Sequence, residues 1–426
     1  MTIPKKISFC LWLFALPIVA QTYVLDTIQN KYSFVNWEAN TIKMAESSPA
    51  FKSLFRKLDT IAKGGKEKLH IFHIGGSHIQ ADIYSNRLRS YLQTMSPTTK
   101  GQRGFIYPYS MAKTNNPGNY KIKYDGKWSG YRCSVRKDSV AWGLSGVTAV
   151  LKDTVSNIKI IANGNNYHDN MYDFNKIRIF YDNWSDDYEI SFKQDSLVSK
   201  ITENKQAHFV EYALNTTVEE IEFCVRKVKD TVNAEFLMMG VELMNDNTGI
   251  EYTSIGVNGG SFSYYERCRY FKEQLLLYKP DLFIISIGTN DAYHPDFDPK
   301  AYKKYYTDFI KLIQQANPDC AVLLTVPNDS YYKRKFPNPR TRIAREVIYE
   351  VAKEQKMAVW DFYEIMGGFN SSQSWYTNKL MPRDRIHFTV KGYRIKADLL
   401  LQALANSWEN ELQLESNSIL NQIINE

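Results

Sequence analysis

The chain has 426 residues, of which 44% are hydrophobic and 23% are charged. This balance is typical of a folded globular chain and excludes a largely disordered one. The formal net charge is +7, but acidic and basic residues are interspersed, so no Lys/Arg block indicates a nucleic-acid-binding stripe. No internal repeat stands out, which argues against solenoids and propellers. The length predicts about two or three domains, or one enlarged domain.

Residues 1–20 have the pattern of a cleaved secretory signal. Lys5 and Lys6 form a charged start, and an apolar stretch follows from Ile7 to Ala20. That stretch is too short to span a bilayer comfortably. We therefore expect cleavage after Ala20, export to the periplasm or the cell exterior, and no stable membrane span afterwards. An uncleaved membrane anchor is the alternative.

The cysteine pattern does not decide whether the chain contains disulfides. Cys10 falls within the predicted signal, so the mature chain keeps Cys133, Cys224, Cys268 and Cys320. An exported chain with four cysteines permits one or two disulfides, with three pairings, while four buried free thiols are the other interpretation. No Cys-x-x-Cys spacing occurs, so the cysteines predict no metal site.

The two ends of the mature chain are predicted to lie outside the main fold. Residues 21–66 form a peripheral helical segment, because apolar residues recur at three- and four-residue spacing over Phe51–Ile61. Residues 413–426 form a C-terminal tail.

The first α/β unit of the main domain occupies residues 67–104. Leu69–Ile74 is a short apolar run with β-branched residues, which predicts a buried strand. Gly75 and Gly76 then predict a tight turn, and helical spacing resumes after it. The chain therefore runs from a strand through a glycine turn to Ser77 and a helix.

Residues 105–247 have a different texture, in which helical spacing fades and short β-like runs appear. Many short strands at this spacing predict an antiparallel β-sandwich, inserted into the α/β domain after its first unit. The runs are Val147–Leu151, Ile158–Ala162, Lys176–Tyr181, Tyr188–Phe192, His208–Tyr212, Glu220–Val225 and Phe236–Leu243.

Residues 248–412 return to alternating strands and helices, which predict a parallel, doubly wound sheet of the α/β class. The expected strands are Leu282–Ile287, Ala321–Val326 and Met357–Phe362. The expected helices are Phe262–Tyr278, Pro299–Asn317, Thr341–Gln355 and Val390–Trp408.

Four short segments at predicted strand ends or helix starts carry residues suited to acyl transfer. Ser77 follows a buried strand, where open α/β sheets bind ligands. The turn containing Gly259 can aim backbone N–H groups inward, and the amide of Asn290 can donate to an oxyanion. Asp384 can orient the imidazole of His387, which can deprotonate a serine. Each segment alone also fits an ordinary turn, loop or cap; the combination favours catalysis.

The order of these segments resembles the SGNH hydrolases, also called GDSL esterases and lipases. The stretches HIGGSHIQAD around Ser77 and SIGVNG ending at Gly259 resemble the exported bacterial branch related to peptidoglycan O-acetylesterases. The resemblance implies a flavodoxin-like doubly wound sheet with an inserted jelly-roll domain. Because no family motif falls within residues 105–247, we expect that insert to govern substrate choice rather than chemistry.

The resemblance further implies an exported serine esterase that removes acyl groups, above all acetyl, from peptidoglycan or another polysaccharide. Its triad is Ser77, His387 and Asp384, and its oxyanion hole is formed by Ser77, Gly259 and Asn290. No metal or organic cofactor and no nucleic acid take part, and the oligomeric state stays open. The alternatives are an O-acyltransferase and a catalytically impaired carbohydrate-binding protein on the same scaffold.

One position departs from the family pattern. The family's Gly-Asp-Ser reads Gly75-Gly76-Ser77 here. The missing Asp is a supporting residue and not a triad member, so its loss loosens the loop of the nucleophile without removing a reacting group. We therefore expect a slower enzyme of unchanged reaction type.

Overall fold

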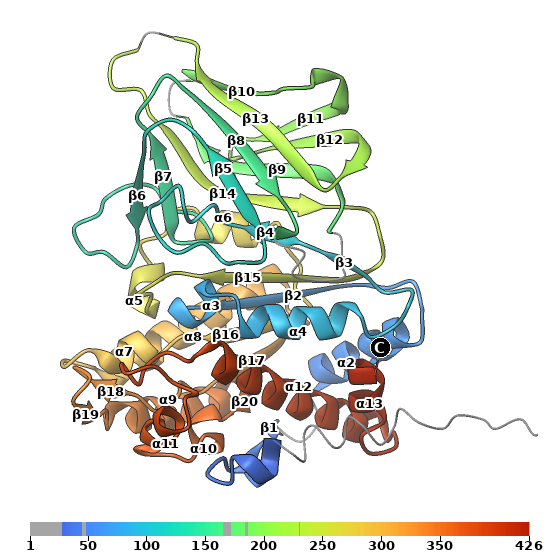
Figure 1. Ribbon diagram of the computed structural model, residues 1–426, viewed down its shortest axis with the longest axis vertical. Coiled ribbons are helices and arrows are strands. Elements are labelled where there is room, and N and C mark those ends of the chain that lie inside the picture. The colour runs from blue at the N-terminus through green and yellow to red at the C-terminus, as the bar shows by residue number, and fades with distance from the viewer. Residues whose placement is uncertain (1–27, 45–47, 165–171, 184–185, 230, 426) are drawn as a thin grey trace, which may run out of the picture.

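The computed structural model describes residues 28–44, 48–164, 172–183, 186–229 and 231–425. The predicted signal lies outside these ranges. Figure 1 shows an α/β body with an all-β insert stacked on one side of it. Within the described part of the chain, no helix combines the length and the apolar character needed to cross a membrane.

A seven-stranded sheet forms the body, in the order β1-β20-β17-β16-β2-β15-β3. All neighbouring strands run parallel except β1, which pairs antiparallel with β20. The strands are β1 (Ile42–Lys43), β2 (Lys68–Gly75), β3 (Lys100–Gln102), β15 (Gly249–Gly256), β16 (Leu282–Ser286), β17 (Ala321–Thr325) and β20 (Ala358–Trp360).

Helices cover both faces of this sheet, which confirms the predicted doubly wound architecture. Leu69 and Ile71 of β2 pack on the side of α2 (Pro49–Ala62), α4 (Tyr84–Gln93) and α12 (Val390–Leu412). Phe72 and Ile74 point the other way, because side chains alternate along a strand, and join the cluster of α8 (Pro299–Ala316) and α9 (Arg340–Gln355).

Shorter helices and turns lie mostly at the sheet ends and the chain ends. They are η1 (Trp37–Ala39), α3 (Ser77–Gln80), α5 (Phe262–Tyr265), α6 (Phe271–Leu275), α7 (Thr289–Tyr293), α10 (Phe362–Ile365), α11 (Ser371–Thr377) and α13 (Ser418–Asn425). A small hairpin joins β18 (Tyr331–Tyr332) to β19 (Phe336–Pro337).

The insert contains two antiparallel sheets, in agreement with the predicted class. One sheet has β5 (Lys121–Tyr124), β8 (Val155–Ile161), β10 (Tyr188–Phe192) and β13 (Glu220–Lys227). The other has β6 (Trp128–Arg132), β7 (Val147–Leu151), β9 (Phe174–Asp182), β11 (Val198–Asn204), β12 (Phe209–Val218) and β14 (Phe236–Met244), with β4 (Gly104–Ile106) beside β14. The sheets face each other across a buried core, where Phe192 and Tyr212 meet with ring centroids 4.6 Å apart. This core is continuous with the α8 side of the body.

The chain passes from one sheet system to the other within a single residue. Gln102 ends β3 in the parallel sheet, and Gly104 begins β4 in the insert. Arg103 between them is buried and donates to Asn119 Oδ1 at 2.9 Å. The body and the insert are therefore joined by packed structure and not by a flexible linker.

Three segments differ from the sequence-based expectation. Ile42–Lys43 forms a strand inside the segment expected to be helical. The single helix expected over residues 262–278 is two short helices, α5 and α6, because Arg267 between them donates to the carbonyls of Cys133 and Val135 in the insert. The C-terminal tail ends in helix α13, which buries Ile419, Leu420 and Ile423.

Gly392 of α12 lets that helix approach the segment that carries Asp384 and His387. A Cβ atom at Gly392 would lie 2.1 Å from the carbonyl oxygen of Leu380, which accepts the backbone N–H of Thr389. Gly392→Ala should therefore destabilise the fold by about 1–3 kcal/mol, against the usual gain from replacing a helical glycine.

The measurement is the free energy of unfolding in urea. Gly118→Ala is the matched control, because a Cβ there meets nothing within 4 Å. Equal unfolding free energies for the two variants would contradict the close approach at Gly392.

Candidate active site

Ser77, His387 and Asp384 form a continuous hydrogen-bonded chain at the carboxyl end of the parallel strands. Ser77 Oγ lies 2.9 Å from His387 Nε2, and His387 Nδ1 lies 2.8 Å from Asp384 Oδ2. The His387 side chain is 40% exposed and that of Asp384 is 22% exposed, so an incoming molecule can reach the serine–imidazole pair. The structure thus brings together three residues that the sequence separates by up to 310 positions.

The environment of Asp384 keeps its carboxyl group ionised. Burial raises the pKa of Asp384, but hydrogen bonds from the His387 ring and from the N–H groups of Ile386 and His387 outweigh burial and lower the pKa to about 2. An ionised carboxylate only accepts hydrogen bonds, so Nδ1 of His387 carries the proton. Nε2 is then an acceptor for the Ser77 hydroxyl.

The turn between Asp384 and His387 is held in an unusual backbone conformation. Arg385 has φ +52°, a region that non-glycine residues seldom occupy. Its guanidinium stacks over the ring of Tyr331 at 3.8 Å and donates to Gln373 Oε1 at 2.8 Å. These contacts stabilise the turn, which places the Asp384 carboxylate within hydrogen-bond distance of Nδ1 of His387.

Ser77 is the first residue of α3 and directly follows Gly75, the last residue of β2, and Gly76. The backbone of α3 lies close against β15: a Cβ at Gly256 would be 2.1 Å from the amide nitrogen of Gln80. A Cβ at Gly75 would likewise be 2.7 Å from the carbonyl oxygen of Ser286 on β16. The absence of side chains at Gly75 and Gly256 therefore lets the Ser77 turn pack directly against β15 and β16.

Gly259 and Asn290 follow the two strands on either side of β2. The Asn290 side chain donates from Nδ2 to the carbonyl oxygen of Gly260 at 2.8 Å, which uses one of its two hydrogens. Gly259 is exposed and has φ +80°, a conformation that favours glycine. The hydrogen bond between Asn290 and Gly260 thus links the two residues beside Ser77. Their action on an oxyanion stays a prediction.

Gln80 joins α3 to the Gly259 loop, and sequence reasoning missed it. Gln80 Oε1 accepts the Asn258 N–H at 2.7 Å, and Nε2 donates to Thr114 Oγ1 at 3.1 Å. From the insert side, Ser134 Oγ donates to the Asn258 carbonyl at 2.6 Å. The insert therefore supports the backbone of the candidate site as well as lying beside it. A glutamine in a helix and a serine in a loop carry no sequence signal for this role.

The ring of His78 lies next to that of His387, the candidate base. Its ring centroid is 5.2 Å from that of His387, and its Nδ1 bonds to Tyr393 Oη at 2.9 Å. Burial, followed by the nearby charge of Lys396, lowers the pKa of His78 well below its usual value. His78 is therefore neutral at physiological pH and supports the His387 ring without competing for its proton.

Neither metal ligation nor a disulfide is evident in the part of the chain that the structure describes. No three His, Cys, Asp or Glu side chains in the described ranges are arranged to hold a metal ion. Cys133, Cys224, Cys268 and Cys320 are all free thiols, and three of them are buried. This geometry corresponds to the free-thiol interpretation of the cysteines.

A cavity of about 290 Å³ opens beside Asn290 and is lined in part by Ser261, Ser263 and Tyr264. Neither Ser77 nor Asp384 nor His387 lines it. A larger cavity of about 560 Å³ lies at the opposite end of the strands and includes none of the candidate catalytic residues.

Residues 239–395 match the sequence profile of the GDSL-like Lipase/Acylhydrolase family. The matched region contains Gly259, Asn290, Asp384 and His387, whereas Ser77 precedes it. The chain thus carries a domain of the GDSL-like lipase and acylhydrolase family, which confirms the predicted class of carboxylic ester hydrolase.

One solved structure is similar over most of the chain, including the insert. A peptidoglycan O-acetylesterase aligns with a TM-score of 0.69 at 19% sequence identity, covering 87% of this chain and 99% of that chain. An acetyl xylan esterase aligns with a TM-score of 0.30 at 21% identity, covering 36% of this chain and 81% of that chain. The first alignment confirms the SGNH hydrolase fold with additional β-structure. No curated protein matches the sequence.

Asp384→Asn should lower kcat by about 10⁴-fold without unfolding the protein, because the amide no longer fixes the His387 tautomer or stabilises the imidazolium. Since the pKa of Asp384 is about 2, its charge is constant from pH 4 upward. Asp384 should therefore contribute no pH dependence to the wild-type activity between pH 5 and 8.

The measurement is kcat on a small acetate ester across this pH range, with circular dichroism as the folding control. A folded Asp384→Asn variant that keeps the wild-type kcat would exclude Asp384 as the residue that orients His387.

Gly76→Asp should speed hydrolysis by restoring a support for the nucleophile turn. A Cβ at Gly76 would lie 3.0 Å from Asn290 Nδ2, so that amide must move by a few tenths of an ångström to make room for a carboxylate that bonds to the neighbouring loop. Better placement of a nucleophile by about 1 Å is worth on the order of 10²-fold in rate. Gly76→Asn is the matched control for the added volume, and kcat is the readout. A slower Gly76→Asp enzyme would show that Asn290 cannot accommodate the added group.

Proposed function

We propose that this protein is an exported serine esterase that removes acetyl groups from an acylated glycan. The hydrogen-bonded chain from Ser77 through His387 to Asp384, at the end of the parallel strands of a GDSL-like domain, carries the proposal. Ser77 is the nucleophile, His387 the general base, and Asp384 the residue that orients and stabilises His387.

In this mechanism, His387 Nε2 takes the Ser77 proton as Oγ attacks the ester carbonyl. The N–H groups of Ser77 and Gly259 and the amide of Asn290 stabilise the oxyanion, because donors aimed at developing charge lower the barrier. His387 then protonates the leaving sugar hydroxyl, which releases an acyl-enzyme on Ser77. Water, deprotonated by His387, hydrolyses that acyl-enzyme.

The choice of an acetylated glycan as substrate rests on the likeness to a solved structure. The structure with the 0.69 TM-score belongs to a peptidoglycan O-acetylesterase, and this chain covers 99% of it. An O-acetylated peptidoglycan or a similar polysaccharide is therefore the substrate that we propose.

Export is proposed from the first twenty residues, where Lys5 and Lys6 precede an apolar stretch with a small residue, Ala20, at its end. A polymeric cell-wall substrate requires an enzyme outside the cytoplasm, so location and substrate agree.

Ser77→Ala should reduce turnover by on the order of 10⁶-fold, since triad members act as a unit and the nucleophile cannot be replaced. Asn290→Ala should cost less, about 10²–10³-fold, as expected for one oxyanion donor. Both are measured as acetate release from O-acetylated peptidoglycan and from acetylated xylan. De-O-acetylated samples of the same polymers serve as controls.

The two alternatives give different results in the same assay. A binding protein without activity would leave wild type and Ser77→Ala indistinguishable from buffer, while the wild type still binds glycan. An O-acyltransferase would release acetate slowly and transfer it to an added sugar acceptor in a Ser77-dependent way. Either result would replace the esterase proposal.

A further inference from the structure

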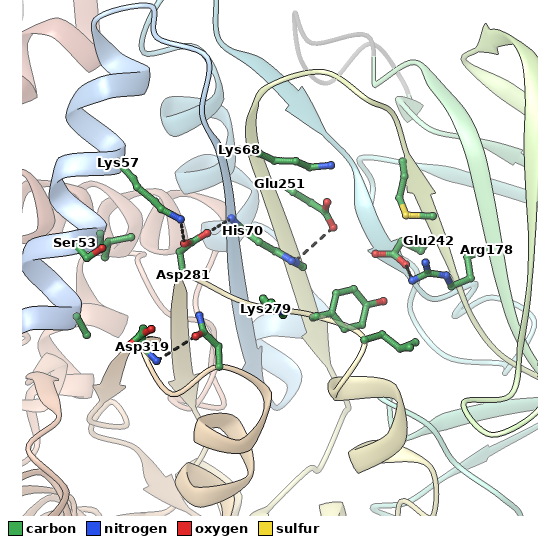
Figure 2. Close-up of a pocket in the computed structure, with 16 residues that line it drawn as sticks. Ser53, Lys57, Lys68, His70, Arg178, Glu242, Glu251, Lys279, Asp281 and Asp319 are labelled. Atoms are coloured by element: carbon green, nitrogen blue, oxygen red, sulfur yellow. Dashed lines mark hydrogen bonds and ion pairs between the residues drawn. The ribbon is translucent and has the colours of Figure 1, made fainter.

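The 560 Å³ cavity lies where the insert meets the body, at the amino ends of β2 and β15. Its walls come from α2, β2, β15, β9 and β14, so residues far apart in the sequence line it (Figure 2). His70 is near the start of β2, whereas Ser77 follows its end, and the rise along a strand puts about 20 Å between them. The cavity is therefore separate from the candidate active site, and its volume suits a small organic ligand.

Two buried carboxyl groups, those of Glu242 on β14 and Glu251 on β15, line the inner wall of this cavity. Glu251 is only 5% exposed, and its Oε1 has no hydrogen-bond partner among the described residues. The closest basic group to that atom is His70 Nε2, at 3.5 Å. An unpartnered carboxylate oxygen that is this deeply buried is costly, so a donor from a ligand would stabilise it.

The surrounding cations do not neutralise this wall. Arg178 is shared, because it donates to Glu242 at 2.7 Å and to Glu211 at 2.6 Å. Burial lowers the pKa of His70 to about 4, so His70 is neutral at pH 7. Burial raises the pKa values of Glu242 and Glu251 to about 7, against the nearby positive charges of Arg178 and Lys68. Arg178 is thus shared between Glu242 and Glu211, and Glu251 Oε1 faces a neutral His70 at 3.5 Å with the positive charge of Lys68 farther off.

A cationic ligand that fits this wall is organic rather than metallic. Because no set of three His, Cys, Asp or Glu side chains in the described ranges can hold a metal ion, a coordinated cation is not supported here. An ammonium group instead needs only a few acceptors, and it can donate to Glu251 Oε1 while facing Glu242. Towards the rim, Lys57 and Lys68 line the same cavity, and Lys57 already pairs with Asp281 at 2.7 Å. Lysine at the rim favours an anionic group at the other end of the ligand.

We propose that this cavity is a binding site for a small amine that also carries a carboxylate, with the ammonium held by Glu251 and Glu242 and the carboxylate facing Lys68. The site does not take part in ester hydrolysis and does not depend on the proposed function. It joins the insert to the body through one ligand, so occupancy also stabilises the contact between them.

The test measures binding of straight-chain ω-amino acids, from glycine to 6-aminohexanoate, to the full-length mature protein by isothermal titration calorimetry. We expect saturable binding of at least one member at pH 8. Its N-acetylated counterpart should bind at least about tenfold more weakly, because the ammonium donor is gone. Binding should weaken as the pH falls from 8 to 6, since protons then compete for Glu251, which is faced by His70, Lys68, Arg178 and Glu242.

Glu251→Gln should weaken binding by about tenfold or more while leaving hydrolysis of a small acetate ester unchanged. Glu220→Gln is the matched control, because that carboxylate is 52% exposed on the insert, where it pairs with Lys159. No saturable binding by any member of the series would overturn the proposal, and this result needs only the wild type. Equal affinity of the amine and its N-acetyl derivative, or an unchanged affinity in Glu251→Gln, would overturn it as well.

Discussion

The direct contact between the backbone of α3 and the backbone of β15 is the constraint on which the candidate site depends. A side chain at Gly256 would force these segments apart, because its Cβ would lie 2.1 Å from the amide nitrogen of Gln80. A side chain at Gly75 would likewise press on β16, because its Cβ would lie 2.7 Å from the carbonyl oxygen of Ser286. With both side chains absent, the ends of β2, β15 and β16 converge. Ser77, Gly259 and Asn290 follow those three strands in turn, so a single packing arrangement brings together the proposed nucleophile and the proposed oxyanion donors.

The insert takes part in this arrangement and is more than an appended module. Ser134 and Thr114 bond to the loop that carries Gly259, directly or through Gln80, and Tyr109 Oη donates to the carbonyl of Gly256 at 2.5 Å. We expected the insert to govern substrate choice rather than chemistry. These bonds give it a second role, because they hold the backbone from which the proposed oxyanion donors extend.

Sequence reasoning performed best where local pattern alone decides the structure. The strand over Leu282–Ile287 and the helix over Pro299–Asn317 lie within one residue of β16 and α8, because apolar runs and helical spacing are local properties. The long helix over residues 262–278 was wrong, since Arg267 bonds to distant carbonyls of the insert. The triad residues were identified from the order of the motifs. The roles of Gln80 and Glu251 depend instead on the groups that the fold brings next to them: Gln80 accepts a hydrogen bond from the Gly259 loop, whereas Glu251 Oε1 has no hydrogen-bond partner among the described residues.

The one-residue crossing at Arg103 has a consequence for how the chain folds. β2 and β15 are neighbours in the parallel sheet, yet about 170 residues separate them, so pairing them in an unfolded chain would require closing a long loop. A prefolded insert brings Gln102 and Gly249 together, since β3 and β15 pair at its base. By the logarithmic dependence of closure entropy on loop length, this shortening lowers the cost of joining the two strands by about 2 kcal/mol. During synthesis the insert would then serve as an internal template, and the nucleophile turn would reach its final form only after the insert had folded.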